Sequence, residues 1–570
     1  MLRFMQPINS KTSRTELHKL IRDLFKGKFD SETDATSVSD NEGSRIVVKW
    51  AKAGSGRDAG RSNRGGKRGV KRDSFPAYIH FTLQKTNRDT QDALSHLSRM
   101  LHASVKDLSV AGTKDKRGVT IQRVSLKRNG KTVEDVWKLA NGQTGRRTMS
   151  EVLTQRGERG VRVSDLNYRK ASLELGMLKG NMFVITLRNV CVESLETIDN
   201  ALNSIKHKGF INYYGMQRFG TASIPTHSIG LALLQSDWHK AVSLILRHRP
   251  GEHPDVIAAR DAWLLEGDLD KALELMPRRV VAERCILESY RKQGGETRNA
   301  MGALSTIPRN LRLMYVHAYQ SYVWNAIVSE RVRMHGAERP VAGDLVFDVE
   351  ASPQDELLIV DPTEGASAAK NSGNEDDRKP NKSRKPWEPQ SVKTLSVEDV
   401  DSYNIFDVIM PLPGTDVAYP GGHLGDKYRE FLRLDGLDPD DFTRKQKEYN
   451  LSGSYRKIIH RPGELSWSVL RYTDPDVPLA QSDEDKLLGF DPPVIDDAGK
   501  FLALQINMKL GTAAYATMAL RELTKTETSS HYQIGLTQAS ADQEYRGSAG
   551  GTSEGNQGID VAIESNVQHD

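Results

Sequence analysis

The sequence predicts an α+β fold with more than one domain, and three observations carry this prediction. A chain of 570 residues is too long for one ordinary hydrophobic core. Short β-branched and aromatic runs alternate with helical patterns in residues 78–126 and again in residues 454–523. Residues 238–331, which lie between these segments, have mostly helical periodicity. We therefore expect strand-rich parts that are separated by a largely helical part.

The chain begins with a segment that precedes the first predicted strand. A helix is predicted at Arg14–Lys26. Lys49–Arg72 is rich in Gly, Ser and Arg, with Asp58 as its one acidic residue, and this composition buries too little apolar surface to fold by itself. Two interpretations of the basic segment remain: a solvated linker, or an arm that meets phosphates or carries a nuclear address.

Strands and helices alternate from about Phe75 onwards. Leu94, Leu97 and Leu101 recur at helical spacing, whereas the runs on either side are rich in β-branched and aromatic residues. The predicted order is strand Tyr78–Leu83, helix Thr86–Leu101, strand Leu108–Ala111, charged loop Gly112–Gly118 and strand Val119–Leu126. Asp115 therefore lies on a short loop between two strands.

The remaining elements follow from the same two periodicities. Val316, Tyr319, Val323 and Ile327 lie on one face of a strong helix at Arg312–Arg331. The others are a strand within Leu175–Val190, a helix at Leu195–Ile205, several helices within Trp238–Tyr290, strands and turns in Ser454–Thr473, a strand at Phe501–Ile506 and a helix at Tyr515–Leu523. Polar composition predicts a disordered insertion at Gly365–Lys385 and a disordered tail after Thr526.

Composition argues against several classes of protein. Cys191 and Cys285 are the only cysteines, too few for a disulfide framework or a four-cysteine zinc site, and we expect no metal and a reducing compartment. No apolar run has the length needed to cross a bilayer, and no signal peptide is evident, so we expect a nuclear or cytosolic protein without a membrane. The sequence also lacks a P-loop, a dinucleotide-binding glycine pattern and a deaminase-type zinc signature.

The first chemical candidate is the charged run Lys114-Asp115-Lys116-Arg117. It could be an ordinary solvated turn. It could also hold a carboxylate among cations, which favour its ionised form and would suit a site that receives a phosphodiester chain. A carboxylate can act as a nucleophile or a base at a glycosidic carbon, as glycosidases show.

Two further patches combine amides, aromatic rings and positive charge. Gly180-Asn181-Met182-Phe183 opens a strand, and it reads either as a turn with a core aromatic or as an amide and a ring for a nucleobase. Asn212–Gly220, with the sequence NYYGMQRFG, is the densest patch and includes Arg218. A loop that faces RNA could use all of these groups, while Tyr213 and Phe219 could instead pack in the core.

A helical interaction scaffold is a competing class. Asp261–Pro277 resembles half of a helical repeat, but the pattern does not recur at the period of about 34 residues that such repeat proteins need.

Taken in order, these patches resemble the motifs of the TruD family of pseudouridine synthases. The catalytic motif is similar to AGTKDKRGVTIQ (Ala111–Gln122), the next to LGMLKGNMFVITLR (Leu175–Arg188), and the third to NYYGMQRFG. HAYQSYVWN (His317–Asn325) resembles a helix of the eukaryotic, multisubstrate branch. The series is completed by PLPG (Pro411–Gly414), SYRKI (Ser454–Ile458), ELSW (Glu464–Trp467) and YATMALREL (Tyr515–Leu523).

The resemblance implies a fold and a domain order. A pseudouridine-synthase catalytic domain with a mixed sheet would carry an inserted α/β TRUD domain, with RNA in the cleft between them. The implied bounds are residues 1–74 for an N-terminal helix and disordered basic linker, 75–205 and 461–525 for the two parts of the catalytic domain, 206–460 for the inserted domain with its disordered insertion at 365–385, and 526–570 for the tail.

The resemblance also implies an activity and a set of site residues. Asp115 matches the catalytic aspartate, Phe183 the aromatic that packs on the target base, and Asn181 its neighbouring amide. The groups expected to contact RNA or substrate are Asn181, Phe183, Lys85, Lys114, Lys116, Asn212 and Arg218. The reaction isomerises uridine to pseudouridine and needs no cofactor. The implied partner is RNA: tRNA first, with small nuclear and messenger RNAs as further candidates, bound by a monomer in the nucleus, the cytoplasm or both.

One family feature does not match. Members carry a strand with the pattern K-x-x-x-x-D-F-x-V-x-E before the first helical region, whereas this sequence runs from MLRFMQPINS directly into the predicted helix. A missing core strand would expose a sheet edge. Two hypotheses follow: an active RNA pseudouridine synthase, or an N-terminally truncated, non-catalytic RNA-binding protein of the same fold.

Overall fold

The computed structural model describes residues 2–3, 8, 10–25, 29–33, 46–50, 75–143, 147–220, 224–249, 251–348 and 391–547. They form two compact units, Met1–Arg72 and Asp73–Asp570. The predicted insertion at 365–385 and residues 51–72 of the basic segment lie outside the described residues. Among the described residues, no helix is long and apolar enough to cross a membrane.

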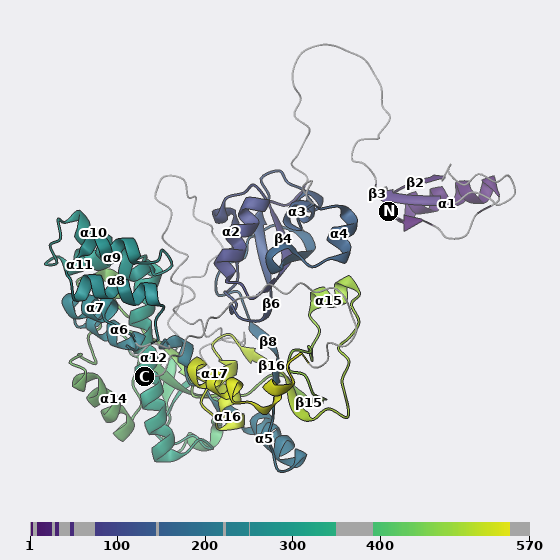
Figure 1. Ribbon diagram of the computed structural model, residues 1–570. Coiled ribbons are helices and arrows are strands. Elements are labelled where there is room, and N and C mark those ends of the chain that lie inside the picture. Colours follow the sequence, from purple (N-terminus) through teal and green to yellow (C-terminus); the bar gives the residue numbers. More distant parts are fainter. Residues whose placement is uncertain are drawn as a thin grey trace. The chain divides into compact units, whose positions relative to one another are not determined.

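The first unit is a small sheet with one helix (Figure 1). Helix α1 (Lys11–Leu24) is capped by Ser10, and strands β1 (Leu2–Arg3), β3 (Ile46–Trp50) and β2 (Phe29–Thr33) pair in that order, all antiparallel. The sequence predicted only the helix and a linker, so these strands correct that prediction. Strand β2 reads FDSET and has one apolar residue, which gives no period-two signal.

The second unit begins with an antiparallel sheet in the order β5-β6-β4-β7. Its strands are β4 (Tyr78–Thr86), β5 (Leu108–Val110), β6 (Val119–Lys127) and β7 (Val161–Arg169), and its helices are α2 (Thr90–Met100), α3 (Val133–Ala140) and α4 (Met149–Thr154). Ile79, Phe81 and Leu83 alternate on the buried face of β4 and pack with Leu94 and Leu97 of α2. Helix α2 starts at Thr90 rather than at Thr86, because Asp89 is its N-cap.

A second sheet has the order β15-β16-β8, all antiparallel. It consists of β8 (Gly180–Leu187), β15 (Leu465–Tyr472) and β16 (Phe501–Gly511), and helices α5 (Leu195–Lys208) and α16 (Ala516–Thr524) pack on it. The predicted disordered tail after Thr526 is wrong for its first part: α17 (Ser530–Gln538) and a 3₁₀-helix η7 (Ala541–Tyr545) follow, and buried Asp542 accepts a hydrogen bond from Tyr472 of β15.

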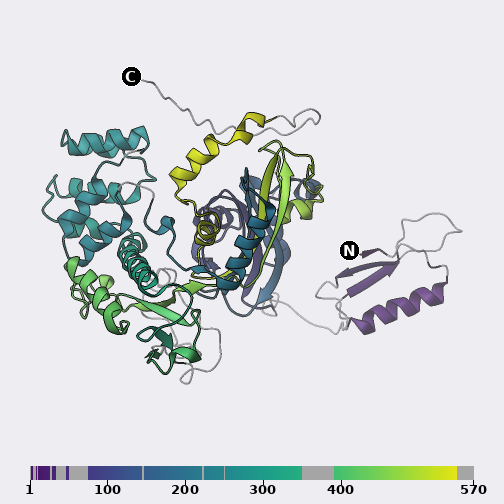
Figure 2. The same cartoon turned by 90° about the horizontal axis from the view of Figure 1, so that it is seen from below.

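The long α12 (Arg309–His335) organises the residues between the two sheets. It packs on α6 (Thr226–Leu234), α14 (Gly422–Leu434) and the strand β12 (Val408–Leu412). Figure 1 shows α6 and α14 beside it, and Figure 2 gives the same part of the chain from below. Further helices are α7 (Trp238–Leu246), α8 (Pro254–Leu264), α9 (Leu269–Leu275), α10 (Val281–Lys292) and α11 (Ala300–Ser305), and strands β11 (Val392–Thr394), β10 (Leu345–Phe347), β12 and β13 (Ser454–Lys457) form a sheet in that order. The bounds of the inserted domain, 206–460, stay a prediction.

Two short strands lie at the two ends of the segment between the sheets that α12 organises. Strand β9 (Phe210–Ile211) pairs antiparallel with β14 (Ile459–His460). His460 Nε2 accepts a hydrogen bond of 3.3 Å from the backbone N–H of Gly511 at the end of β16, and its ring meets Phe210 edge-on. Burial, together with Arg456 and Lys457, lowers the pKa of His460 to about 4.

We expect His460 to make stability depend on pH. Above its ordinary pKa of about 6.5 the ring is neutral in both states. As pH falls from 6.5 towards 4, the unfolded chain binds a proton that the folded chain excludes, so the folded state loses stability over that window. His460→Gln keeps an acceptor for Gly511 but does not titrate. The urea midpoint of wild type should therefore fall relative to that of His460→Gln between pH 7 and pH 4; a constant difference would contradict the assignment.

Candidate active site

Asp115 lies where the sequence predicted, on the loop between β5 and β6, and its side chain is exposed. Lys116 and Arg117 beside it are exposed as well. Gly118 ends the loop with φ +100°, a conformation that glycine adopts without strain. The loop therefore presents a carboxylate among cations to solvent.

Lys85, at the end of β4, is buried beside the Asp115 loop. It was expected to contact RNA, but its exposed fraction is 0% and it lies against the Asp115 loop. Its ammonium donates to the backbone carbonyl oxygens of Arg88 (2.7 Å), Asp115 (2.5 Å) and Lys114 (3.4 Å). Burial lowers the pKa of Lys85, and the charges of Asp89 and Asp115 oppose that shift. A buried side chain with these partners holds the protein's own backbone, and its expected contact with RNA or substrate stays a prediction.

The loop also contacts the second sheet. The Lys114 ammonium donates to Asn181 Oδ1 on β8. Phe183 lies two residues further along the same strand, so it shares a face with Asn181. It pairs with Met508 of β16 and packs, half-buried, on the apolar cluster of that sheet. The predicted residues Lys114, Asp115, Asn181 and Phe183 thus belong to two adjoining elements.

The third motif divides into a buried and an accessible part. Asn212 is only 3% exposed; its carbonyl and its side-chain oxygen both accept hydrogen bonds from Arg456 at 2.7 and 2.8 Å, and its amide donates to the Lys457 carbonyl at 3.0 Å. The polar atoms of Asn212 are thus engaged inside the protein, and its expected contact with RNA stays a prediction. Arg456 itself is buried over the rings of Tyr214 and Trp324.

Arg218 is half-buried on a short 3₁₀-helix, η3 (Met216–Arg218), with its guanidinium 5.4 Å from the ring centre of Tyr214. The neighbouring Gln217 donates to Thr517 of α16 at 3.3 Å. The motif therefore contacts helix α16, which packs on the second sheet.

The family profile described as TruD, tRNA pseudouridine synthase D, matches residues 64–380, which is more than half of the chain. The chain belongs to the TruD family. Relatives agree: pseudouridylate synthase 7 homolog of Bos taurus is 37% identical over 535 residues, which are 93% of this chain and 69% of the relative. Multisubstrate pseudouridine synthase 7 of Schizosaccharomyces pombe is 37% identical over 529 residues, 92% of this chain and 71% of that protein.

A solved structure supports the fold of this TruD-family chain. A Methanosarcina mazei chain assigned to tRNA pseudouridine synthase D aligns with a TM-score of 0.52 at 24% identity, covering 79% of this chain and 89% of that one. The predicted α+β pseudouridine-synthase fold is confirmed. The chain is an RNA pseudouridine synthase of the eukaryotic multisubstrate branch, and hence an isomerase.

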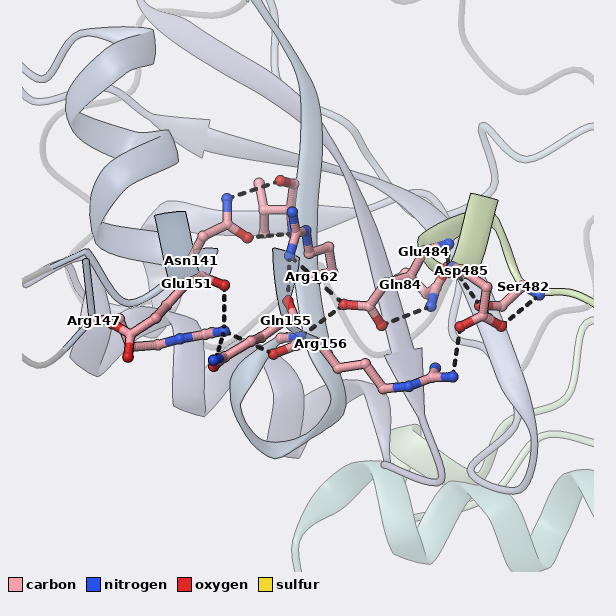
Figure 3. A network of polar contacts seen from close by, with 12 residues as sticks. Gln84, Asn141, Arg147, Glu151, Gln155, Arg156, Arg162, Ser482, Glu484 and Asp485 are labelled. Carbon is pink, nitrogen blue, oxygen red and sulfur yellow. Dashed lines mark hydrogen bonds and ion pairs between the residues drawn. The ribbon is translucent and has the colours of Figure 1, made fainter. Parts of the chain in front are cut away.

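A buried polar network joins β4, β7 and α15 in this TruD-family chain (Figure 3). Glu484 of α15 (Asp483–Leu488), 4% exposed, accepts from the Gly157 N–H at 2.7 Å and from the Gln84 amide at 3.3 Å. Its own N–H donates to the Gln84 side chain at 3.0 Å, and Arg162 of β7, 5% exposed, lies 3.9 Å from its carboxylate. Because Gln84 precedes Lys85 on β4, the network fixes the strand that carries Lys85.

The sequence analysis missed several residues around this TruD-family site. It assigned no role at the site to Asn87, Thr90, Arg456 or Glu484. The available signal was the polar run Lys85–Thr90 between a strand and a helix, which is longer than one N-cap requires. Among the described residues no cluster of His, Cys, Asp or Glu could hold a metal ion.

Proposed function

We propose that this chain isomerises uridine to pseudouridine in RNA with Asp115 as the catalytic carboxylate. The contact between Lys114 and Asn181 carries the proposal, because it holds the Asp115 loop against the strand of Phe183.

In the reaction the bond between ribose C1′ and uracil N1 breaks, uracil turns, and a bond from C1′ to C5 forms. The C5 proton is released and N1 gains one, so the atoms balance without an oxidant or cofactor. Asp115 would attack the ribose or remove a ribose proton.

The expected substrate is tRNA, with small nuclear and messenger RNAs as further candidates, acted on by a monomer in the nucleus, the cytoplasm or both. The relatives' names support this range, since one is called multisubstrate. Positive charge at Lys114, Lys116, Arg117 and Arg218 suits a phosphodiester backbone. The uridine must leave the base stack to reach Asp115, at a cost of a few kcal/mol that these contacts have to offset.

Phe183 is expected to pack on the displaced base. Phe183→Leu keeps apolar bulk against Met508 but removes the ring, and base–aromatic stacking is worth about 1–3 kcal/mol. We expect the KM for RNA to rise about tenfold or more, measured by initial rates over a range of RNA concentrations. Met182→Leu is the matched control, because Met182 points to the opposite face of β8 and is 60% exposed. An unchanged KM in Phe183→Leu would contradict the stacking role.

Release of tritium from uracil C5 tests the function. The full chain is incubated separately with tRNA, small nuclear RNA and messenger RNA transcripts, each labelled at C5, and RNA binding is measured alongside. Release from any of them supports the synthase and identifies the substrate class. RNA binding without release would select the alternative, a non-catalytic RNA-binding protein, and absence of both would contradict the proposal.

A further inference from the structure

The polar run between β4 and α2, Lys85–Thr90, contacts the Asp115 loop along its backbone. Thr90, which is fully buried, accepts a hydrogen bond from the Lys114 N–H at 3.1 Å and lies 3.2 Å from the Lys114 carbonyl. These contacts hold the residue immediately before Asp115. A hydroxyl in this place can serve one backbone N–H and one carbonyl at once.

The far end of the loop is held in the same way. The side-chain oxygen of Asn87 accepts from the Gly118 N–H at 2.8 Å, and the Asn87 N–H donates to the Gly118 carbonyl at 3.0 Å. Asn87 has φ 51°, a left-handed conformation that asparagine tolerates better than most residues. The pairing is reciprocal, so it fixes both the position and the direction of the chain where the loop ends.

Lys85 contacts the loop between the two positions that Thr90 and Asn87 hold. Its ammonium lies against the carbonyls of Arg88, Lys114 and Asp115, and it is fully buried. Removing an ammonium from water costs several kcal/mol. Charge-assisted hydrogen bonds to aligned carbonyls offset that cost only while the loop keeps this conformation. The buried charge therefore favours one geometry of the Asp115 backbone over others.

We propose that Lys85, Asn87 and Thr90 are positioning residues that form a clasp around residues 114–118 and set the direction of the Asp115 carboxylate. The inference rests on the proposed catalytic role of Asp115. An exposed loop without such contacts would sample several conformations, and a displacement of about 1 Å from the reactive geometry can cost about 100-fold in rate. The clasp would act on the chemical step and leave the binding of RNA to other surfaces.

The sharpest test compares Thr90→Val with Thr90→Ser. Valine has nearly the same shape as threonine but no hydroxyl, whereas serine keeps the hydroxyl. We expect the single-turnover rate with saturating enzyme to fall about tenfold in Thr90→Val, in proportion to one hydrogen bond, and to stay within about twofold in Thr90→Ser. The dissociation constant for tRNA should change less than about twofold in both. Equal rates in the two variants would overturn the proposal.

Lys85→Met gives a larger effect, expected to be about 100-fold in the same rate with tRNA affinity retained. Arg331→Met is the matched control for general destabilisation, because Arg331 is also a fully buried cation, paired with Asp344 and remote from the loop in sequence. Comparable rate losses in Lys85→Met and Arg331→Met, or a loss of tRNA affinity in Lys85→Met, would overturn the proposal. Should Lys85→Met not fold, the threonine pair decides alone.

Asp115→Asn separates this inference from the function on which it rests. If Asp115→Asn is inactive while Thr90→Val and Lys85→Met keep the wild-type rate, the clasp is refuted and the catalytic carboxylate stands. If Asp115→Asn is active, the catalytic assignment itself fails.

Discussion

Replacement of Asp115 by asparagine is expected to lower the rate of pseudouridine formation by at least about 100-fold, and by as much as about 10,000-fold if a proton transfer is lost with it. The amide has the same shape as the carboxylate but is a poor nucleophile and a poor base. The measurement is tritium release from C5-labelled tRNA under single-turnover conditions, which reports the chemical step apart from product release.

Binding should respond differently from rate. The Asp115 side chain is exposed, and its replacement removes one negative charge from a loop that we propose to face RNA phosphates, so we expect tRNA affinity to stay the same or rise slightly. Glu134→Gln is the charge-matched control, because Glu134 is exposed on α3 and pairs with Lys138 in an i,i+4 contact. A rate for Asp115→Asn within tenfold of wild type would refute the catalytic role.

Removal of the Glu484 side chain should have the largest effect on stability. Glu484→Ala leaves the Arg162 guanidinium buried without its carboxylate and removes the acceptor of the Gly157 N–H and of the Gln84 amide. Removal of one partner of a buried ion pair lowers the free energy of unfolding by about 3–5 kcal/mol. We expect a clear drop in the urea midpoint, followed by intrinsic fluorescence, and a fall in rate because Gln84 adjoins Lys85.

Glu464→Ala is the control for this experiment. Glu464 forms an exposed pair with Lys509 at 3.2 Å between neighbouring strands, and exposed pairs contribute at most about 1 kcal/mol. Its urea midpoint should stay close to that of wild type. If Glu484→Ala and Glu464→Ala have the same urea midpoint, the Figure 3 network does not stabilise the packing of α15 on the β5-β6-β4-β7 sheet.

Local patterns predicted the elements whose signal is local. Strand β4 and helix α2 were found because Tyr78–Leu83 is rich in β-branched and aromatic residues and Leu94 and Leu97 recur at helical spacing. Asp115 was placed on its loop for the same reason. Strand β2, which pairs with β3, was missed because all but one of its side chains are polar.

The roles of polar residues were harder to predict than the elements. Asn212 looked like an RNA contact, yet its partner Arg456 lies 244 residues away. Lys85 was assigned to substrate by its proximity to the site, but whether a lysine points to solvent or to backbone depends on packing that periodicity does not encode. Such side chains are satisfied by residues from distant segments, and one sequence holds no signal for these pairings.

The 400 residues between Gln84 and Glu484 also bear on how the protein is made. A ribosome adding roughly 5–20 residues per second needs about 20–80 seconds to synthesise the stretch between them. During that interval the strands of the β5-β6-β4-β7 sheet are synthesised, while Arg162 of β7 still lacks the carboxylate of Glu484. The contacts of Glu484 with this sheet therefore form only after residue 484 has been translated, and chaperones would have the most to protect before then.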